Sequence, residues 1–224
     1  VVPKKDKVDL FYDKLAMYDF LSGNGVTVPP YMGVRTVNDL EHACRKIPLH
    51  DGKFIVKLSR SRGGRGIFLV SMSAHEKRTF FDRDEMAVIS LTDMAEIVES
   101  TKDNMFMAME YLEGDYYDVD VLSDNGVPVY LIQRKRVNPN GIPWQGSEII
   151  DNKKMADIST NICNLLSLHY LYDFDMFEKD GIVYPLEINP RLSGSTCATF
   201  SAGINLYGDL LKMALNLPIE RKTI

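Results

Sequence analysis

Three polar side chains stand at alternate positions near the C-terminal end of the sequence. An apolar stretch, residues 181–186, leads into Glu187, Asn189 and Arg191. Alternate residues of a β-strand point to one face, so a carboxylate, an amide and a guanidinium would stand in a row. Mg²⁺ takes such oxygens beside those of phosphate, and a guanidinium binds phosphate or carboxylate. The row also fits a solvated strand end with a Glu187–Arg191 ion pair, so both interpretations stay open.

A further carboxylate lies on the strand that precedes this row. Residues 171–177 are predicted to form a strand that turns at 178–181 and pairs with the apolar stretch. Such a hairpin would bring Asp175 opposite Glu187. Two carboxylates held together repel unless a cation or a proton lies between them. The hairpin therefore predicts bound Mg²⁺ at this pair.

A glycine-rich loop with three arginines lies between two predicted strands, residues 53–58 and 67–70. Glycines let a backbone approach a ligand closely, and the arginines, together with Lys57 at the strand end, suit phosphate. No GxxxxGK[ST] pattern occurs, and a strand follows the glycines, so the loop is neither a Walker A loop nor a Rossmann fingerprint. By itself it fits either a phosphate cover or a flexible hairpin tip.

Hydrophobic periodicity and capping residues predict the elements that would position these groups. Helices are predicted at 10–22 (with Lys14 in its first half), 36–47, 91–101 (capped near Thr92), 153–168 and 204–215. Residues 105–112 are predicted to form a buried strand that leads into a hinge between two lobes. The backbone of such a hinge can hold the edge of a purine.

A hairpin is predicted from residues 117–122 and 127–132, joined by a turn with good turn chemistry. Asp118 and Asp120 share one face of it, either as metal ligands or, more often for such residues, as the solvated side of a half-buried strand. The basic segment 133–136 is predicted to end the hairpin. This segment fits two interpretations equally well: contact with an anionic substrate, or a solvated run of charges. Residues 137–147 are predicted to be a loop.

Length, composition and charge exclude several classes of protein. The 224 residues are enough for one large domain or two small lobes, and 45% hydrophobic with 25% charged residues is ordinary for a globular protein. A net charge of −5 gives no basic field for nucleic acid. Three cysteines without CxxC spacing and four scattered histidines predict neither a disulfide framework nor a zinc site. No apolar run approaches the ~20 residues of a membrane span, so we expect a soluble, cytoplasmic protein without membrane or nucleic-acid partners.

Taken in order, these parts resemble the ATP-grasp superfamily, nearest the carbamoyl-phosphate synthase large-subunit type and the small ATP-grasp ligases. The shared order is a helix lysine, a strand lysine with a glycine-rich hairpin, an apolar hinge with Glu-Tyr-Leu, and an Asp hairpin that ends in Glu-x-Asn-Pro-Arg. The resemblance covers essentially the whole chain. It implies an α+β fold in which two α+β lobes, built mainly from antiparallel sheets, clamp the nucleotide. The implied parts are an N-terminal helix and connecting segment (1–34), a small lid lobe with the glycine-rich loop (35–112) and a larger catalytic lobe (113–224).

The resemblance also implies a set of site residues. The residues expected to contact ATP are Lys14, Lys57, Ser59, Gly63, Gly64, Gly66, Glu110, Tyr111, Leu112 and Asp115. The two lysines would contact the phosphates, the loop would fold over them, and the backbone at 110–112 would hold the adenine edge. Asp175, Glu187 and Asn189 would ligate one or two Mg²⁺ ions, with Mn²⁺ as an alternative. Arg191, with Lys57 as the second catalytic residue, would stabilise charge on the transferred phosphoryl group or the acyl-phosphate.

The chain departs from the family pattern in three places. Many members carry an acidic residue two places after the hinge glycine to bind the ribose, where this chain has Tyr116; Asp115 is expected to substitute, or the ribose is held otherwise. Asp175 is one methylene shorter than the glutamate found in some relatives. Members usually have an α/β domain before the helix that carries Lys14. Its absence leads us to expect an excised piece, or a partner chain or second copy that supplies the missing wall.

The activity implied by the resemblance is that of an ATP- and Mg-dependent carboxylate–amine or carboxylate–thiol ligase, which acts on small molecules through an acyl-phosphate and releases ADP. One alternative is phosphorylation of bicarbonate or carbamate, as in carbamoyl-phosphate synthase. Another is a non-catalytic ATP-binding module. The presence of Lys57, Asp175, Glu187, Asn189 and Arg191 together favours an enzyme, because a module without turnover would not need all five.

Overall fold

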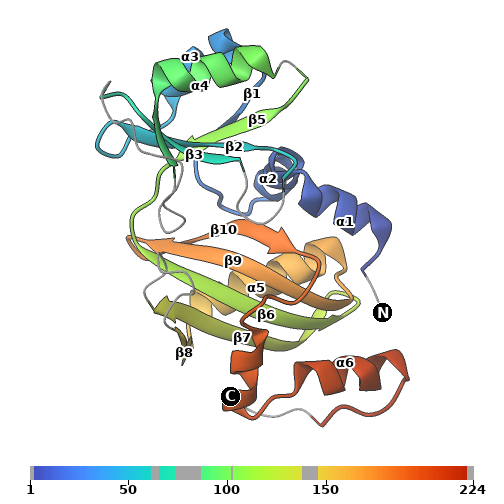
Figure 1. Cartoon of the computed structure of the whole chain (residues 1–224). Helices are drawn as coiled ribbons and strands as arrows, with labels where there is room; N and C mark the ends of the chain where they lie inside the picture. The colour runs from blue at the N-terminus through green and yellow to red at the C-terminus, as the bar shows by residue number, and fades with distance from the viewer. Residues whose placement is uncertain (1–2, 62–65, 74–86, 102, 138–145, 221–224) are drawn as a thin grey trace.

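The computed structural model describes residues 3–61, 66–73, 87–101, 103–137 and 146–220. The strands form two five-stranded sheets, which lie one above the other in Figure 1. The chain is therefore α+β with mainly antiparallel sheets, as expected from the sequence. Among the described residues, no helix combines the length and the apolar composition that a membrane span requires.

Residues 31–110 build the first sheet, in the spatial order β1-β5-β2-β3-β4. Its strands are β1 (Tyr31–Val34), β2 (Lys53–Leu58), β3 (Ile67–Ser71), β4 (Ala87–Ser90) and β5 (Phe106–Glu110). Neighbouring strands are antiparallel except β3 and β4, which are parallel. Because side chains alternate along a strand, Phe54 and Val56 pack into the core beneath the helices of this half, whereas Lys57 faces the opposite side.

The second sheet has the order β10-β9-β6-β7-β8 and is antiparallel throughout. Its strands are β6 (Asp115–Asp124), β7 (Val127–Val137), β8 (Gly146–Ile150), β9 (Tyr170–Lys179) and β10 (Ile182–Asn189). Val119 and Phe174, on one face, belong to the main apolar core. On the other face, Leu122 and Ile132 pack against Leu206 at one end of the sheet. The remaining end of that face carries polar side chains.

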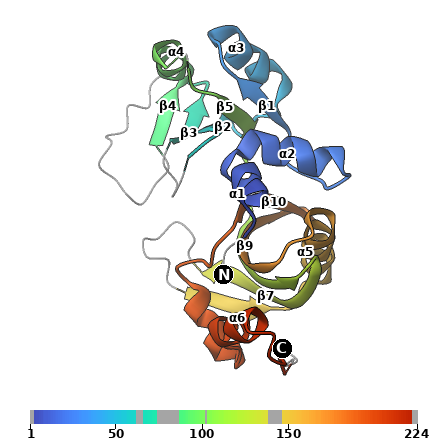
Figure 2. The ribbon, with the colours of Figure 1, turned by 90° about the vertical axis from the view of Figure 1, so that its right-hand side faces the viewer.

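Helices cover the outer faces of both sheets and also lie near the place where the sheets meet. They are α1 (Lys5–Tyr12), α2 (Lys14–Gly23), α3 (Val37–Lys46), α4 (Leu91–Ser100), α5 (Lys153–Leu166), the 3₁₀ helix η1 (Thr196–Ala202) and α6 (Leu206–Ala214). Figure 2 shows α1 and α2 between the two sheets. There Phe11 and Tyr18 join a core that includes Ile55 of the first sheet and Phe174 of the second. The two halves therefore share apolar contacts through these helices.

A short hinge, residues 111–114, carries the chain from the first sheet to the second. At its end the backbone of Gly114 passes so close to β9 that a Cβ atom would lie 2.3 Å from the carbonyl oxygen of Glu178. Its φ of +157° is also one that other residues rarely adopt. Glycine is therefore required where the chain enters the second sheet.

The helix predicted at 10–22 is wrong in its extent, because two helices meet at Asp13. This residue is extended, with φ −104° and ψ 98°, and its side chain accepts a hydrogen bond from the backbone N–H of Ala16. Such a cap begins a new helix. Lys14 is consequently the first residue of α2 and does not lie inside a longer helix. Similarly, α4 is capped by Ser90 and not near Thr92.

The predicted hairpin is also longer than expected. β7 continues to Val137, so the basic segment 133–136 lies within the sheet and pairs with β6 and β8 instead of ending the hairpin. The strand β8 falls partly in the predicted loop 137–147, and η1 was not predicted. The helix predicted at 153–168 ends at Leu166, because Ser167 adopts a left-handed conformation with φ 47°.

Replacing Gly114 tests the close approach at the hinge. We expect Gly114→Ala to lower the free energy of unfolding by about 2 kcal/mol, because the added methyl group collides with backbone that cannot swing away. Urea denaturation measures the change. Gly23→Ala is the matched control, since nothing lies within 4 Å of its Cβ position. Equal stability of the two variants would contradict the steric requirement.

Candidate active site

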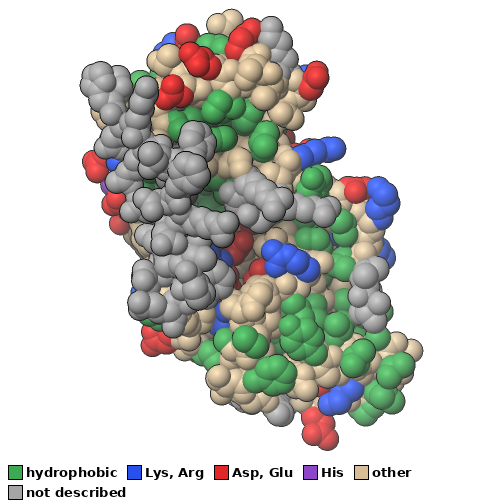
Figure 3. Space-filling view, viewed as in Figure 1, with side chains coloured by type: hydrophobic (Ala, Val, Ile, Leu, Met, Phe, Trp, Pro, Cys, Tyr) green, Lys and Arg blue, Asp and Glu red, His purple; other side chains and the backbone are tan. Residues whose placement is uncertain are grey.

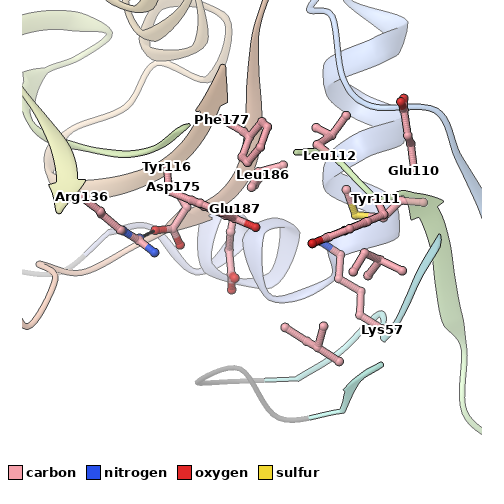
Figure 4. Close-up of a pocket in the computed structure, with 13 residues that line it drawn as sticks. Lys57, Glu110, Tyr111, Leu112, Tyr116, Arg136, Asp175, Phe177, Leu186 and Glu187 are labelled. Atoms are coloured by element: carbon pink, nitrogen blue, oxygen red, sulfur yellow. Dashed lines mark hydrogen bonds and ion pairs between the residues drawn. The ribbon is translucent and has the colours of Figure 1, made fainter. Parts of the chain in front are cut away.

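A pocket of about 170 Å³ lies between the two sheets, beside the hinge. Its lining residues come from both halves of the chain: Ile55, Lys57, Ile67, Met109, Glu110, Tyr111, Leu112, Tyr116, Arg136, Asp175, Phe177, Leu186 and Glu187. Figure 4 shows Phe177 and Leu186 together on one side, with the charged ends of Asp175 and Arg136 next to them and Lys57 across the pocket. The pocket therefore combines an apolar part with a charged part.

Two buried lysines reach the charged part of the pocket. Lys57 is 6% exposed, and its Nζ lies 5.3 Å from the centre of the Tyr18 ring. Burial lowers the pKa of Lys57 to about 8, although the nearby Glu187 carboxylate acts in the opposite direction. The Nζ of Lys14 donates to the carbonyl oxygen of Ser61 at 3.0 Å and lies 3.6 Å from Oε1 of Glu187. Two ammonium groups therefore lie near one carboxylate.

Acidic side chains form two rows across the second sheet. The strand register places Glu187 opposite Asp175 and Asp175 opposite Asp118. The second row, one pleat further along, consists of Asn189, Asp173 and Asp120. Directly opposed residues on neighbouring strands have close Cβ atoms and point to the same face. The sheet thus gathers five carboxylates and one amide on one face.

Two arginines of β7 offset part of this negative charge. Arg134 is fully buried, and its Nε donates to Oδ2 of Asp120 at 2.7 Å. Nη2 of Arg136 pairs with both Asp118 and Asp175. Burial nevertheless raises the pKa of Asp173, and the carboxylates of Asp175 and Asp118 raise it further. Burial likewise raises the pKa of Asp175, although Arg136 acts against this rise. Figure 3 shows acidic and basic side chains gathered near the middle of the molecule.

The end of β10 leads from the pocket into a second cavity of about 460 Å³. Asn189 donates from Nδ2 to Oδ2 of Asp175 at 3.3 Å, and its Oδ1 accepts from Nη2 of Arg191 at 3.4 Å. Arg191 is 59% exposed and lines the second cavity together with Tyr12 of α1. Glu187 lines both cavities. It therefore stands between the two cavities.

The structure brings most of the predicted site residues together around these cavities. Lys57, Glu110, Tyr111, Leu112, Asp175 and Glu187 line the first, Glu187, Asn189 and Arg191 the second, and Lys14 reaches Glu187 between them. The predicted pairing of Asp175 with Glu187 is confirmed. Glu110 lines the pocket although its carboxylate pairs with Lys179 at 2.9 Å and its backbone N–H donates to the carbonyl of Pro30.

Other predicted site residues lie elsewhere. The hydroxyl of Ser59 donates to Oδ1 of Asp13 at 2.5 Å, which places it in the cap of α2. Asp115 pairs with Lys135 at 2.7 Å and is absent from the described lining of the pocket, where Tyr116 is found instead. Gly66 closes the base of the loop, since its carbonyl accepts from the N–H of Leu58. Gly63 and Gly64 lie outside the described residues.

Arg134, Arg136, Asp118 and Asp120 were not among the predicted site residues. The interpretation of Asp118 and Asp120 as a solvated face is wrong, because they are 1% and 0% exposed. The interpretation of the basic segment as a solvated run is wrong for Arg134, which is buried in ion pairs. The alternating Asp-x-Asp and Arg-x-Arg patterns on the two strands of one hairpin are the feature of the sequence that suggests ion pairs between them, although they do not give the register.

Several solved structures have a similar fold. L-amino acid ligase from Bacillus licheniformis has a TM-score of 0.63 at 18% identity, over 95% of this chain and 49% of that one. D-alanine–D-alanine ligase from Bacillus anthracis, complexed with ATP, has a TM-score of 0.61 at 17% identity, over 92% of this chain and 65% of that one. N5-carboxyaminoimidazole ribonucleotide synthetase from Thermotoga maritima has a TM-score of 0.66 at 20% identity, over 98% and 53%. The chain thus spans about half to two thirds of the length of these structures.

Sequence comparisons give a result that agrees with these structures. No curated protein matches the chain. The family model described as "ATP-grasp in the biosynthetic pathway with Ter operon" matches residues 102–223, which is more than half of the chain and includes β6 to β10 with Asp175, Glu187, Asn189 and Arg191. The chain belongs to this ATP-grasp family.

Proposed function

We propose that the chain binds ATP with Mg²⁺ between its two sheets and uses it to activate a carboxylate, which an amine or a thiol then attacks. The observation that carries this proposal is that Lys57 of one sheet and Asp175 and Glu187 of the other line the same pocket. Two of the similar solved structures are named as ligases and a third as a synthetase, and one of them is complexed with ATP, which supports the same class of reaction.

The apolar part of the pocket suits the adenine ring. Ile55 and Met109 of the first sheet and Phe177 and Leu186 of the second would offer apolar contact to a purine, and the hinge at 110–112, which also lines the pocket, would meet its edge. Ligand pockets commonly combine such apolar walls with a few polar groups that fix orientation. In this proposal residues 35–112 act as a lid over a nucleotide held on residues 113–224, with the helices and connecting segment of residues 1–34 beside both.

The charged part of the pocket suits the phosphates and their metal. Asp175, Glu187 and Asn189 offer the oxygen ligands that Mg²⁺ and Mn²⁺ accept, and the strand register already holds them side by side, so they fit this ion. Bound there, Mg²⁺ would neutralise charge on the phosphate oxygens. The ammonium groups of Lys14 and Lys57 would bind those oxygens directly, with no need to reorganise.

The second cavity suits the carboxylate that is activated. Glu187 separates it from the nucleotide pocket, so a carboxylate there would lie on the far side of the phosphate-binding residues. The exposed guanidinium of Arg191 would hold that carboxylate and stabilise the charge that develops on the acyl-phosphate. Attack by an amine or thiol then releases phosphate.

Replacing Glu187 tests the nucleotide site. We expect the chain to bind a non-hydrolysable ATP analogue in the presence of Mg²⁺, and Glu187→Ala to weaken this binding at least about 10-fold, because a metal ligand is lost. Calorimetric titration with and without Mg²⁺ measures both effects. Glu148→Ala, at an exposed position of β8, is the control and should bind like the wild type. Binding that ignores both Mg²⁺ and Glu187 would overturn the proposed site.

Turnover separates the proposed ligase from the alternatives. With ATP and Mg²⁺, we expect ADP release to require a carboxylate together with an amine or thiol, and Glu187→Ala to abolish it while the far-ultraviolet circular dichroism stays unchanged. Release driven by bicarbonate alone would instead favour the carbamoyl-phosphate type of reaction. Binding without release, over a broad panel of carboxylates and acceptors, would favour a binding module.

The lowered pKa of Lys57 predicts a pH dependence of nucleotide binding. Phosphate favours the ammonium form, so binding should take up protons near pH 8, where the free protein has partly lost this proton. Affinity should therefore fall as the pH rises above about 8, by up to ~10-fold per pH unit. Calorimetry in buffers of different ionisation enthalpy measures the uptake. Lys57→Met should abolish this proton uptake, whereas Lys53→Met, on the same strand, should retain it. Equal uptake in both variants would refute this role of Lys57.

A further inference from the structure

Three carboxylates meet on the second sheet beside the metal set described above. Asp118 of β6 and Asp173 and Asp175 of β9 each offer one oxygen, and these three oxygens lie within 4.8 Å of one another. Asp175 belongs to the set with Glu187 and Asn189, whereas Asp118 and Asp173 do not. Asp118 is 1% exposed and Asp173 is 2% exposed. The cluster is therefore built into the sheet and is not a solvated acidic surface.

The arginines around this cluster do not balance its charge. Four buried or half-buried carboxylates face one another across β6 and β9, because Asp118 stands opposite Asp175 and Asp120 stands opposite Asp173. Arg134 and Arg136 supply two positive charges to them. Among the described residues Arg191 also approaches Asp173, but only at 4.0 Å and with 59% of its side chain exposed. Without a bound cation this excess of carboxylates over arginines is relieved only by protonation, and a divalent cation would offset it instead.

Asp173 provides a second, separate observation. Its Oδ1 is buried and has no hydrogen-bond partner among the described residues, and its Oδ2 accepts from Nδ2 of Asn189 at 3.4 Å. Buried carboxylate oxygens are nearly always paired, since an unpaired one loses its hydration without compensation. A carboxylate oxygen held in this way within an acidic cluster is available as a ligand atom for a cation.

Arg136 occupies the same cluster from the pocket side. Its Nε donates to both carboxylate oxygens of Asp118, at 3.0 and 3.1 Å, and its Nη2 pairs with Asp118 and Asp175. It also lines the nucleotide pocket, and Figure 4 shows its guanidinium against Asp175. A guanidinium is a single charge spread over a wide plane. A divalent ion of smaller radius concentrates twice the charge at the same oxygens.

We propose that Asp118, Asp173 and Asp175 bind a second divalent cation, and that Arg136 is the counter-ion which this cation displaces. The three ligands are all carboxylates, which indicates a hard ion such as Mg²⁺ or Mn²⁺. The displaced guanidinium stays on the wall of the nucleotide pocket, where it can pair with an anionic ligand. The site stands on the contacts of the sheet and does not depend on the proposed ligase activity.

Mn²⁺ binding to the nucleotide-free chain, followed by electron paramagnetic resonance, tests this site. We expect Arg136→Met to bind one Mn²⁺ per chain at least ~10-fold more tightly than the wild type, because the competing cation is gone. Lys135→Met is the matched control: it removes a neighbouring positive charge that pairs with Asp115 outside the cluster, and it should leave Mn²⁺ affinity unchanged.

Second substitutions in the Arg136→Met background identify the ligands. Adding Asp173→Asn should return Mn²⁺ binding to the weak level, whereas adding Glu187→Gln should leave it tight. Circular dichroism confirms that each variant is folded. The proposal is overturned if Arg136→Met binds Mn²⁺ no more tightly than the wild type, or if Glu187→Gln abolishes the tight binding and Asp173→Asn does not. Because no nucleotide is present, these results are separate from those of the ADP-release assay.

Discussion

Negative charge gathered on one face of the second sheet is the constraint on which the rest of the site depends. A buried carboxylate costs several kcal/mol unless it is paired, and breaking a buried pair costs about 3–5 kcal/mol. Arg134 and Arg136 offset part of this cost, and β7 has to extend to Val137 to deliver them. Arg134 also donates to the hydroxyl of Ser195, and Thr196 donates to Asp120, which folds the segment after β10 back over the sheet.

The polar site lies where the apolar packing on this face of the second sheet ends. Along β6, Leu122 lies beneath α6, whereas Asp120 and Asp118, on the same face, lie beyond it. The alternation of side chains keeps the opposite face apolar for α5. One face of β6 thus packs into an apolar core. Its other face changes from apolar core to polar site within a few residues. The first sheet lines the pocket from the other side, with Lys57 as its charged contribution.

Local patterns in the sequence predicted the parts of the site that depend on alternation. Lys57 faces away from Phe54 and Val56, as period-two reasoning requires. Asp175 stands opposite Glu187 as expected, although a bulge between Pro185 and Glu187 shifts the register of that hairpin by one residue. The pairing of the aspartates with the arginines of β7 was beyond that reasoning. A bulge between Leu122 and Ser123 shifts the register by one residue, so counting back from the turn would place Asp118 opposite Gln133 and not opposite Arg134. Burial of the aspartates depends on tertiary packing, which cannot be inferred from the sequence of the hairpin alone.

The cap of α2 has a consequence for the cost of ligand binding. The backbone N–H of Lys14 donates to the carbonyl of Ser59, and its Nζ donates to that of Ser61, so the lysine is tied to the base of the loop that follows β2. A free lysine side chain gives up about 1.5–2 kcal/mol of rotamer entropy when a ligand immobilises it. Here most of that loss has already occurred during folding. The start of α2 is therefore preorganised. An anion that binds Lys14 gains the attraction to its ammonium group without the entropic cost of ordering the lysine side chain.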